Sequence, residues 1–164
     1  MRYVIETLIY SCIYAVFMIV FVVRQGAVRQ LHNYPPKIQE RVIELGITTR
    51  EQMAADSKKY KPLGFAVMLV ICMVIICIVN KETRFWAGFF QAYLFLNAWS
   101  FFDAAVFDSL WFCRGRFWVL PGTEDMTEAY HDYWFHWKWF FLGLIAEIPL
   151  CIVMGGLTAL FALL

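Results

Sequence analysis

The sequence predicts an all-α integral membrane protein, a four-transmembrane-helix bundle, and composition and run length carry this prediction. Hydrophobic residues make up 62% of the 164 residues and charged residues only 16%, whereas a soluble domain contains about 25% charged residues. A spanning helix needs about 20 apolar residues. Only four such runs are found, so we expect a single membrane domain over residues 1–164.

These four runs define the predicted spans. The first is interrupted only by Glu6, the second carries no charge, and the third has none before Asp103. The fourth carries only Glu147 in its apolar part and begins with a polar cytoplasmic extension. The spans cover about residues 3–23, 63–79, 85–113 and 123–164, and the longer connections cover residues 24–62 and 114–122.

The first connection is predicted to form a cytoplasmic amphipathic helical hairpin. After the turn sequence NYPP, the apolar residues Ile38, Val42 and Leu45 recur at a helical spacing. Gly46 then ends this first helix of the hairpin.

The second helix of the hairpin is predicted from its start signal. Thr48 with Glu51 is typical of a capping box, and the helix is expected to run to about Tyr60, before Pro62 starts the next span. The hairpin is expected to lie on the inner leaflet, where its lysines and arginines meet anionic lipid. A docking platform for a cytosolic partner is the alternative.

The distribution of lysine and arginine predicts the orientation of the chain. Eleven of the 14 lie in the two longer connections or at their edges, and only Arg2, Lys81 and Arg84 lie on the other side. Because basic residues gather in cytoplasmic loops, we expect a multi-pass protein of the cell membrane with both termini outside and both longer loops cytoplasmic. A net charge of +1 gives no basic excess for nucleic acid.

The last span carries a predicted stripe of polar residues. If the helix begins after Thr123 and runs continuously at about 100° per residue, six residues share one face. Glu147 lies roughly 16 Å beyond His136 and so deep in the membrane, where an ionised carboxylate is costly. Pro149 is expected to bend the helix at that depth. The stripe consists of Asp125, Glu128, Asp132, His136, Gly143 and Glu147.

The third span supplies expected partners for this stripe. Asn97 and Asp108 share one side, and Asp103 is offset from them by about 120–140°. With the two spans antiparallel, Asp103 is expected near the depth of Glu147 and Asp108 near that of Phe140. Two acids at similar depth favour a shared proton or a bound cation.

The cytoplasmic interface carries two further candidate sites, one for a metal ion and one for a lipid headgroup. Glu128 with His131, and Asp132 with His136, have spacings at which one helix can hold a divalent metal ion. Histidines among Trp and Tyr are alternatively residues of an interfacial aromatic belt. Arg114 and Arg116 can hold a lipid phosphate or act as inside-positive anchors.

The functional hypothesis is a small proton- or cation-linked transporter or channel subunit. Its ion- or substrate-binding residues are expected to be Asn97, Asp103, Asp108, Asp132, His136 and Glu147. Whether the chain is an enzyme stays open, because an integral-membrane enzyme at the inner interface and a noncatalytic assembly subunit are alternatives. Four helices are too few to enclose a wide pore, so besides membrane lipids we expect a second copy or a partner membrane subunit.

Overall fold

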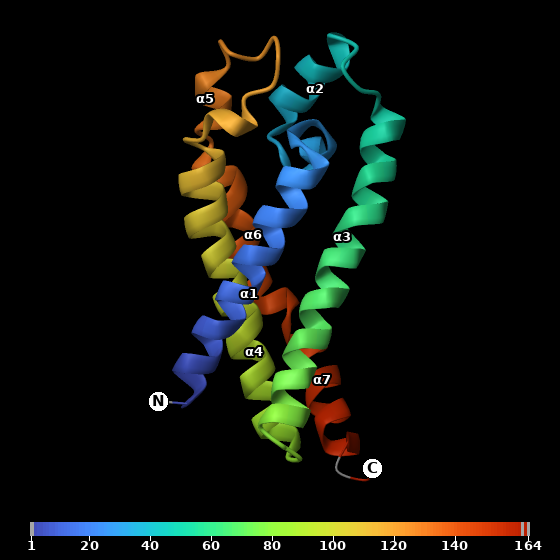
Figure 1. Cartoon of the computed structure of the whole chain (residues 1–164), viewed down its shortest axis with the longest axis vertical. Helices are drawn as coiled ribbons and strands as arrows, with labels where there is room; N and C mark the ends of the chain where they lie inside the picture. Colours follow the sequence, from blue (N-terminus) through green and yellow to red (C-terminus); the bar gives the residue numbers. More distant parts are fainter. Residues whose placement is uncertain (1, 162, 164) are drawn as a thin grey trace.

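The chain folds into a set of long helices that run side by side (Figure 1). The computed structural model describes residues 2–161 and 163, and all the regular structure in this part of the chain is helical. The all-α prediction is therefore confirmed. The long elements are α1 (Arg2–Gln25), α3 (Arg50–Met73), α4 (Phe85–Phe102), α6 (Tyr133–Ala146) and α7 (Ile148–Phe161).

The two ends of the molecule differ in what they carry (Figure 1). The start of α1 and the ends of α3 and α7 lie at one end, which we call the terminal end. The opposite end, the loop end, holds residues 26–49 and 113–132, with α2 (Pro36–Glu44) and α5 (Thr127–Tyr130). Both longer connections thus lie together.

Two helices in the described part of the chain are long and apolar enough to cross a membrane. They are Arg2–Gln25 and Arg50–Val79, and a third span results if Thr127–Ala146 and Ile148–Phe161 count as one despite a bend of 47° between them. The helix from Phe85 is not among them, because amide, Trp and Tyr side chains lower its hydropathy. The structure therefore supports a membrane protein with two or three candidate spans and does not confirm the fourth.

The helix break predicted between the hairpin and the second span is not present. Helix α3 runs without interruption from Arg50 through Pro62 and continues as a π-helical segment, η2 (Val74–Val79). Thr49, not Thr48, caps its start, since the Thr49 side chain accepts a hydrogen bond from the Gln52 amide at 3.2 Å. Proline inside a helix removes a single backbone hydrogen bond, and here the flanking turns hold the helix together.

The other half of the predicted hairpin is present but packs against protein. Ile38 and Val42 of α2 are fully buried, as their helical spacing predicts. They belong to an apolar cluster at the loop end that also contains Tyr34, Trp118 and Tyr130. The apolar face of α2 is therefore covered by the second connection instead of by lipid.

The predicted continuous helix from about residue 123 is also wrong. Thr123 is buried in a turn, where its hydroxyl donates to the Leu120 carbonyl at 2.7 Å, so it caps no helix. The chain then forms the single turn α5 and breaks at His131 and Asp132. Asp132 restarts it, because its carboxylate accepts a hydrogen bond from the Phe135 amide at 3.0 Å.

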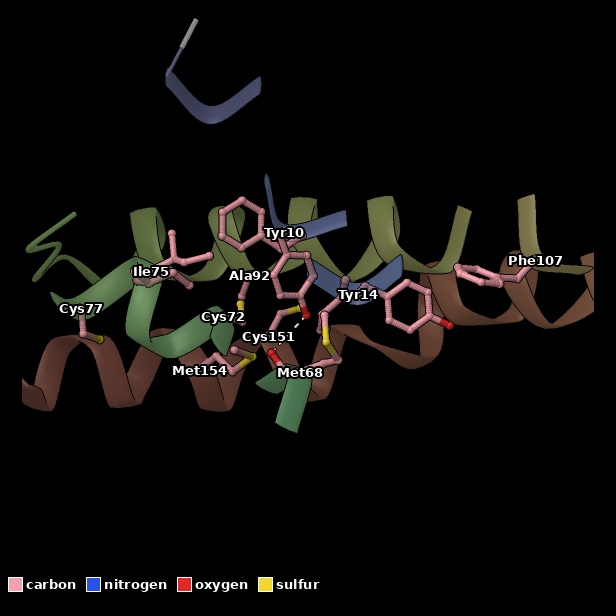
Figure 2. Packing of buried hydrophobic residues seen from close by; sticks show 13 residues of the cluster. Tyr10, Tyr14, Met68, Cys72, Ile75, Cys77, Ala92, Phe107, Cys151 and Met154 are labelled. Atoms are coloured by element: carbon pink, nitrogen blue, oxygen red, sulfur yellow. Dashed lines mark hydrogen bonds between the residues drawn. The ribbon is translucent and has the colours of Figure 1, made fainter. Parts of the chain in front are cut away.

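Close helix packing forms the core in the terminal half. Tyr10 of α1 donates a hydrogen bond to the Met68 carbonyl of α3 at 3.1 Å, with Cys72 and Cys151 packed nearby (Figure 2). Helices α4 and α7 meet at Gly88, where an added Cβ would lie 2.4 Å from the Thr158 hydroxyl oxygen. The absence of a side chain at this position therefore permits the contact.

Candidate functional site

A π-helical segment, η3 (Asp103–Phe112), continues α4 and carries the two acids predicted for this span. Its hydrogen bonds join residues five apart, as in that from the Cys113 amide to the Asp108 carbonyl at 2.9 Å. Residues five apart are offset by about 140° in an α-helix, and the wider turn of a π-helix makes this offset smaller. The predicted offset of Asp103 from Asp108 is therefore wrong, and both acids line the same cavity.

This cavity has a volume of about 420 Å³ and is bounded by α1, η1 (Ala27–Asn33), α4 with η3, and α6. Such a volume falls within the range of small-molecule sites. Its lining is mixed, with aromatic rings of the loop end beside polar groups. The polar side chains include Gln30, His32, Lys61, Ser100, Asp103, Asp108 and His136.

An acid–histidine pair forms one wall of the cavity. The Nδ1 atom of His136 lies 3.2 Å from Oδ1 of Asp108, and the His136 side chain is only 6% exposed. The Nε2 atom is buried and has no hydrogen-bond partner among the described residues. Asp108 therefore orients the ring, and the second ring nitrogen is left for a ligand or a proton.

Asp103 has a different partner one turn deeper. The Tyr14 hydroxyl of α1 donates a hydrogen bond to Oδ1 of Asp103. Tyr14 lies between the core around Tyr10 and the ring of Phe107 (Figure 2), which itself lines the cavity. The two acids are thus each held by one neighbouring side chain.

Glu147 lies at the bend between α6 and α7, where the predicted break at this depth is present. The Ser100 hydroxyl donates to its Oε1 at 3.0 Å, and its Oε2 is buried without a partner in the described chain. The expected pairing of Glu147 with Asp103 is not formed, because each acid bonds a different hydroxyl. Ser100 lines the cavity and so connects Glu147 to it.

The remaining predicted ion-site residues lie elsewhere. Asn97 donates to the Tyr93 carbonyl of its own helix at 2.8 Å, and its Oδ1 is buried without a partner among the described residues. Asp132 is exposed and serves as the cap of α6. Neither residue is among those that line the cavity in the described part of the chain.

The four residues predicted to hold a divalent metal ion are not brought together. Glu128 and His131 are exposed, Asp132 caps α6, and His136 is buried against Asp108. Within residues 2–161 and 163, no group of three or more His, Cys, Asp or Glu side chains is placed to hold a metal ion. The break at residues 131 and 132 separates the predicted ligands.

The two arginines predicted to bind a lipid headgroup are exposed at the loop end. The guanidinium of Arg114 donates to the Tyr133 hydroxyl at 3.4 Å, and this hydroxyl raises the pKa of Arg114. Arg116 begins a short 3-10 turn. A role for either residue in lipid binding stays a prediction.

Sequence reasoning missed two groups that form the cavity. The side-chain nitrogens of Gln30 and Trp118 are buried without a partner among the described residues, and both residues line the cavity. Both lie in connections whose course depends on tertiary packing, so no local pattern identifies them. Tyr14 was likewise hidden in an apolar run.

A second polar cluster, at the terminal end, was also missed. The Glu6 carboxylate accepts hydrogen bonds from Arg2 at 2.7 Å, from Asn80 at 2.9 Å and from Gln91 at 2.8 Å. We call these four residues the Glu6 cluster. It joins α1, the end of η2 and α4, and none of its side-chain atoms is among the buried, unpartnered ones in the described chain.

Comparison of the chain with protein-family models, with curated proteins and with solved structures found no match. The geometry of the cavity is therefore the basis for any functional inference.

Proposed function

We propose that the protein is a four-span protein of the cell membrane that acts as a proton-linked transporter, or as a subunit of one. The observation that carries the proposal is the placement of Asp103 and Asp108 in one cavity with His136. Rows of titratable side chains inside a membrane bundle are the usual route of proton transfer.

The fourth proposed span is α4 with η3. Its polar side chains face protein: Gln91 is buried against Glu6, and Asn97 bonds its own backbone. A helix of this kind crosses a membrane with its polar groups turned away from lipid. Together with the basic residues at the loop end, this favours cytoplasmic loops and external termini.

Protons are proposed to enter from the loop end. His136 Nε2 takes up a proton from the cavity, and the resulting imidazolium is stabilised by the Asp108 carboxylate beside Nδ1. Asp103 follows one turn deeper, and Ser100 leads to Glu147. Residues 108 to 100 run along η3 into α4, so the row extends from the loop end toward the middle of the bundle.

An enzyme acting at the inner-leaflet interface is the second candidate. A histidine held by a carboxylate at one nitrogen and free at the other has the arrangement of a general base. The row of acids beyond it has no role in such a reaction, and for this reason we favour transport. Because four helices enclose no wide pore, the proposed transporter includes a second copy or a partner membrane subunit.

Proton flux in liposomes tests the proposal. Purified protein is reconstituted around a pH-sensitive dye, and a potassium gradient with valinomycin imposes a negative interior. We expect acidification faster than in empty liposomes, and its loss in Asp103→Asn and Asp108→Asn, which keep shape but cannot ionise. Asp132→Asn retains the capping oxygen of an exposed acid and is the matched control.

Two outcomes would count against transport. Wild-type protein that conducts no faster than empty liposomes contradicts it, and so does undiminished flux in both amide variants. In the second case the acids are structural, and the assembly subunit becomes the better interpretation.

A further inference from the structure

The loop-end wall of the cavity is rich in hydrogen-bond donors that nothing in the described chain satisfies. Gln30, Trp118 and His136 are 3%, 7% and 7% exposed, and each has a buried side-chain nitrogen without a partner. Buried polar groups are nearly always hydrogen-bonded. The Lys61 side chain lines the same cavity and adds a positive charge. The side-chain nitrogens of Gln30 and Trp118 are donors, whereas His136 Nε2 becomes a donor only when it is protonated. Two donors and one ammonium group favour a ligand that presents negatively charged oxygens.

The acids of the cavity do not offset this preference. Asp108 is held by His136, and Asp103 accepts the Tyr14 hydroxyl. Both belong to η3 and so lie deeper than Gln30 and Trp118, which belong to the loop-end connections.

An apolar groove joins the donor-rich wall. It has a volume of about 170 Å³, and its walls are Phe17 and Phe21 of α1 with Tyr60, Gly64 and Phe65 of α3. The groove and the cavity share lining residues, namely Met18, Gln30, His32, Asn33 and Lys61. Phe65 is 41% exposed on the outer surface of α3, so the groove leads from the cavity toward the lipid-facing side of the bundle.

We infer that the site binds a membrane lipid with an anionic headgroup. The headgroup oxygens accept hydrogen bonds from Gln30, Trp118 and Lys61, and the acyl chain passes between α1 and α3. This inference rests on the proposed function, since it names the ligand of the same cavity. Protonation of His136 adds a fourth donor, which couples lipid binding to proton uptake.

Gly64 offers a direct way to block the chain-binding groove. An added Cβ at this residue would lie 3.8 Å from the nearest atom of Phe17, an ordinary contact, so the helix tolerates a side chain. Gly64→Leu therefore places a side chain in the groove, of which Gly64 is a lining residue, and raises helix propensity. Gly156→Leu is the matched control, because an added Cβ on α7 meets nothing within 4 Å.

Native mass spectrometry of the detergent-purified protein tests the inference. Oleoyl lysophosphatidic acid carries an anionic head, and monoolein carries the same chain without a charge. We expect one bound lysophosphatidic acid per protein, about tenfold or more in preference to monoolein. Gly64→Leu should lower this binding by about tenfold, as should Gln30→Glu, which replaces the donor by a carboxylate. Gly156→Leu should bind as the wild type does.

Three outcomes would overturn the inference: equal binding of the two lipids, undiminished binding by Gly64→Leu, or full competition by inorganic phosphate at the same concentration as the lipid. The last would indicate a free anion as the ligand. Lipid binding is measured independently of proton flux. If the protein conducts protons but does not prefer lysophosphatidic acid to monoolein, only the lipid-binding inference is contradicted. Preserved preference in a protein that conducts no protons contradicts only transport.

Discussion

The Glu6 cluster and the cavity at His136 are both polar sites inside an apolar bundle, and they differ in how far their groups are satisfied. The Glu6 carboxylate receives three donors from two other segments and one neighbouring turn. At His136, by contrast, one ring nitrogen, the amide nitrogen of Gln30 and the indole nitrogen of Trp118 lack partners in the described chain.

The difference separates a structural role from a binding role. A satisfied cluster stabilises the packing of its helices and leaves nothing to bind. Unsatisfied donors around a space of about 420 Å³ cost free energy in the empty protein, and a ligand recovers that energy. Stability should therefore depend on the Glu6 cluster, and function on the cavity.

The largest effect on stability is expected at Glu6. Glu6→Ala leaves Gln91, which is 4% exposed, without its acceptor and also removes the bonds from Arg2 and Asn80. An unsatisfied buried group costs about 1–3 kcal/mol, and we expect a loss of about 3 kcal/mol in the free energy of unfolding in detergent. Arg84→Ala, which removes the exposed arginine of the pair with Glu82, is the control. Equal stability of the two variants would mean that the cluster does not hold the helices.

A smaller effect on stability is expected from removing the Asp108–His136 pair from the cavity. The double variant Asp108→Leu, His136→Phe replaces both partners by apolar groups of similar size. Such replacements are often nearly neutral, so we expect the free energy of unfolding to stay within about 1 kcal/mol of the wild type. Proton flux should nevertheless be lost. A double variant that unfolds as readily as Glu6→Ala would remove the distinction between the two sites.

Some features of the fold were accessible from the sequence, and the reasons are physical. Ile38 and Val42 are buried because their spacing places them on one helical face, and the bend at Glu147 follows from Pro149. The break at Asp132 and the continuity of α3 through Pro62 were not accessible from the sequence. Both depend on tertiary contacts, which decide where a helix starts and stops.

Part of the candidate site was also predicted from the sequence. His136 was predicted from the polar stripe of the last span, and Asp103 and Asp108 were predicted as its partners on the third span. Their common cavity was not, because a π-helix changes which residues share a face and no sequence pattern indicates its i→i+5 bonds. Gln30 and Trp118 gain their role only from burial, which their own connections do not reveal.

A last effect, expected only in the pH dependence of stability, concerns His32, which lines both the cavity and the apolar groove. Burial, with the Lys61 ammonium nearby, lowers the pKa of His32 from 6.5 to about 4. Between pH 4 and 6.5 the unfolded chain therefore binds a proton that the folded chain does not, so this group makes stability rise with pH across that window. His32→Asn should reduce the rise in unfolding temperature between pH 4.5 and 7, whereas His131→Asn, at an exposed position, should leave it unchanged.

Because carboxyl groups titrate over the same range, the comparison is between the variants and the wild type at each pH. An unchanged pH dependence in His32→Asn would show that His32 takes up its proton in the folded protein, which would add a positive charge to the donor wall.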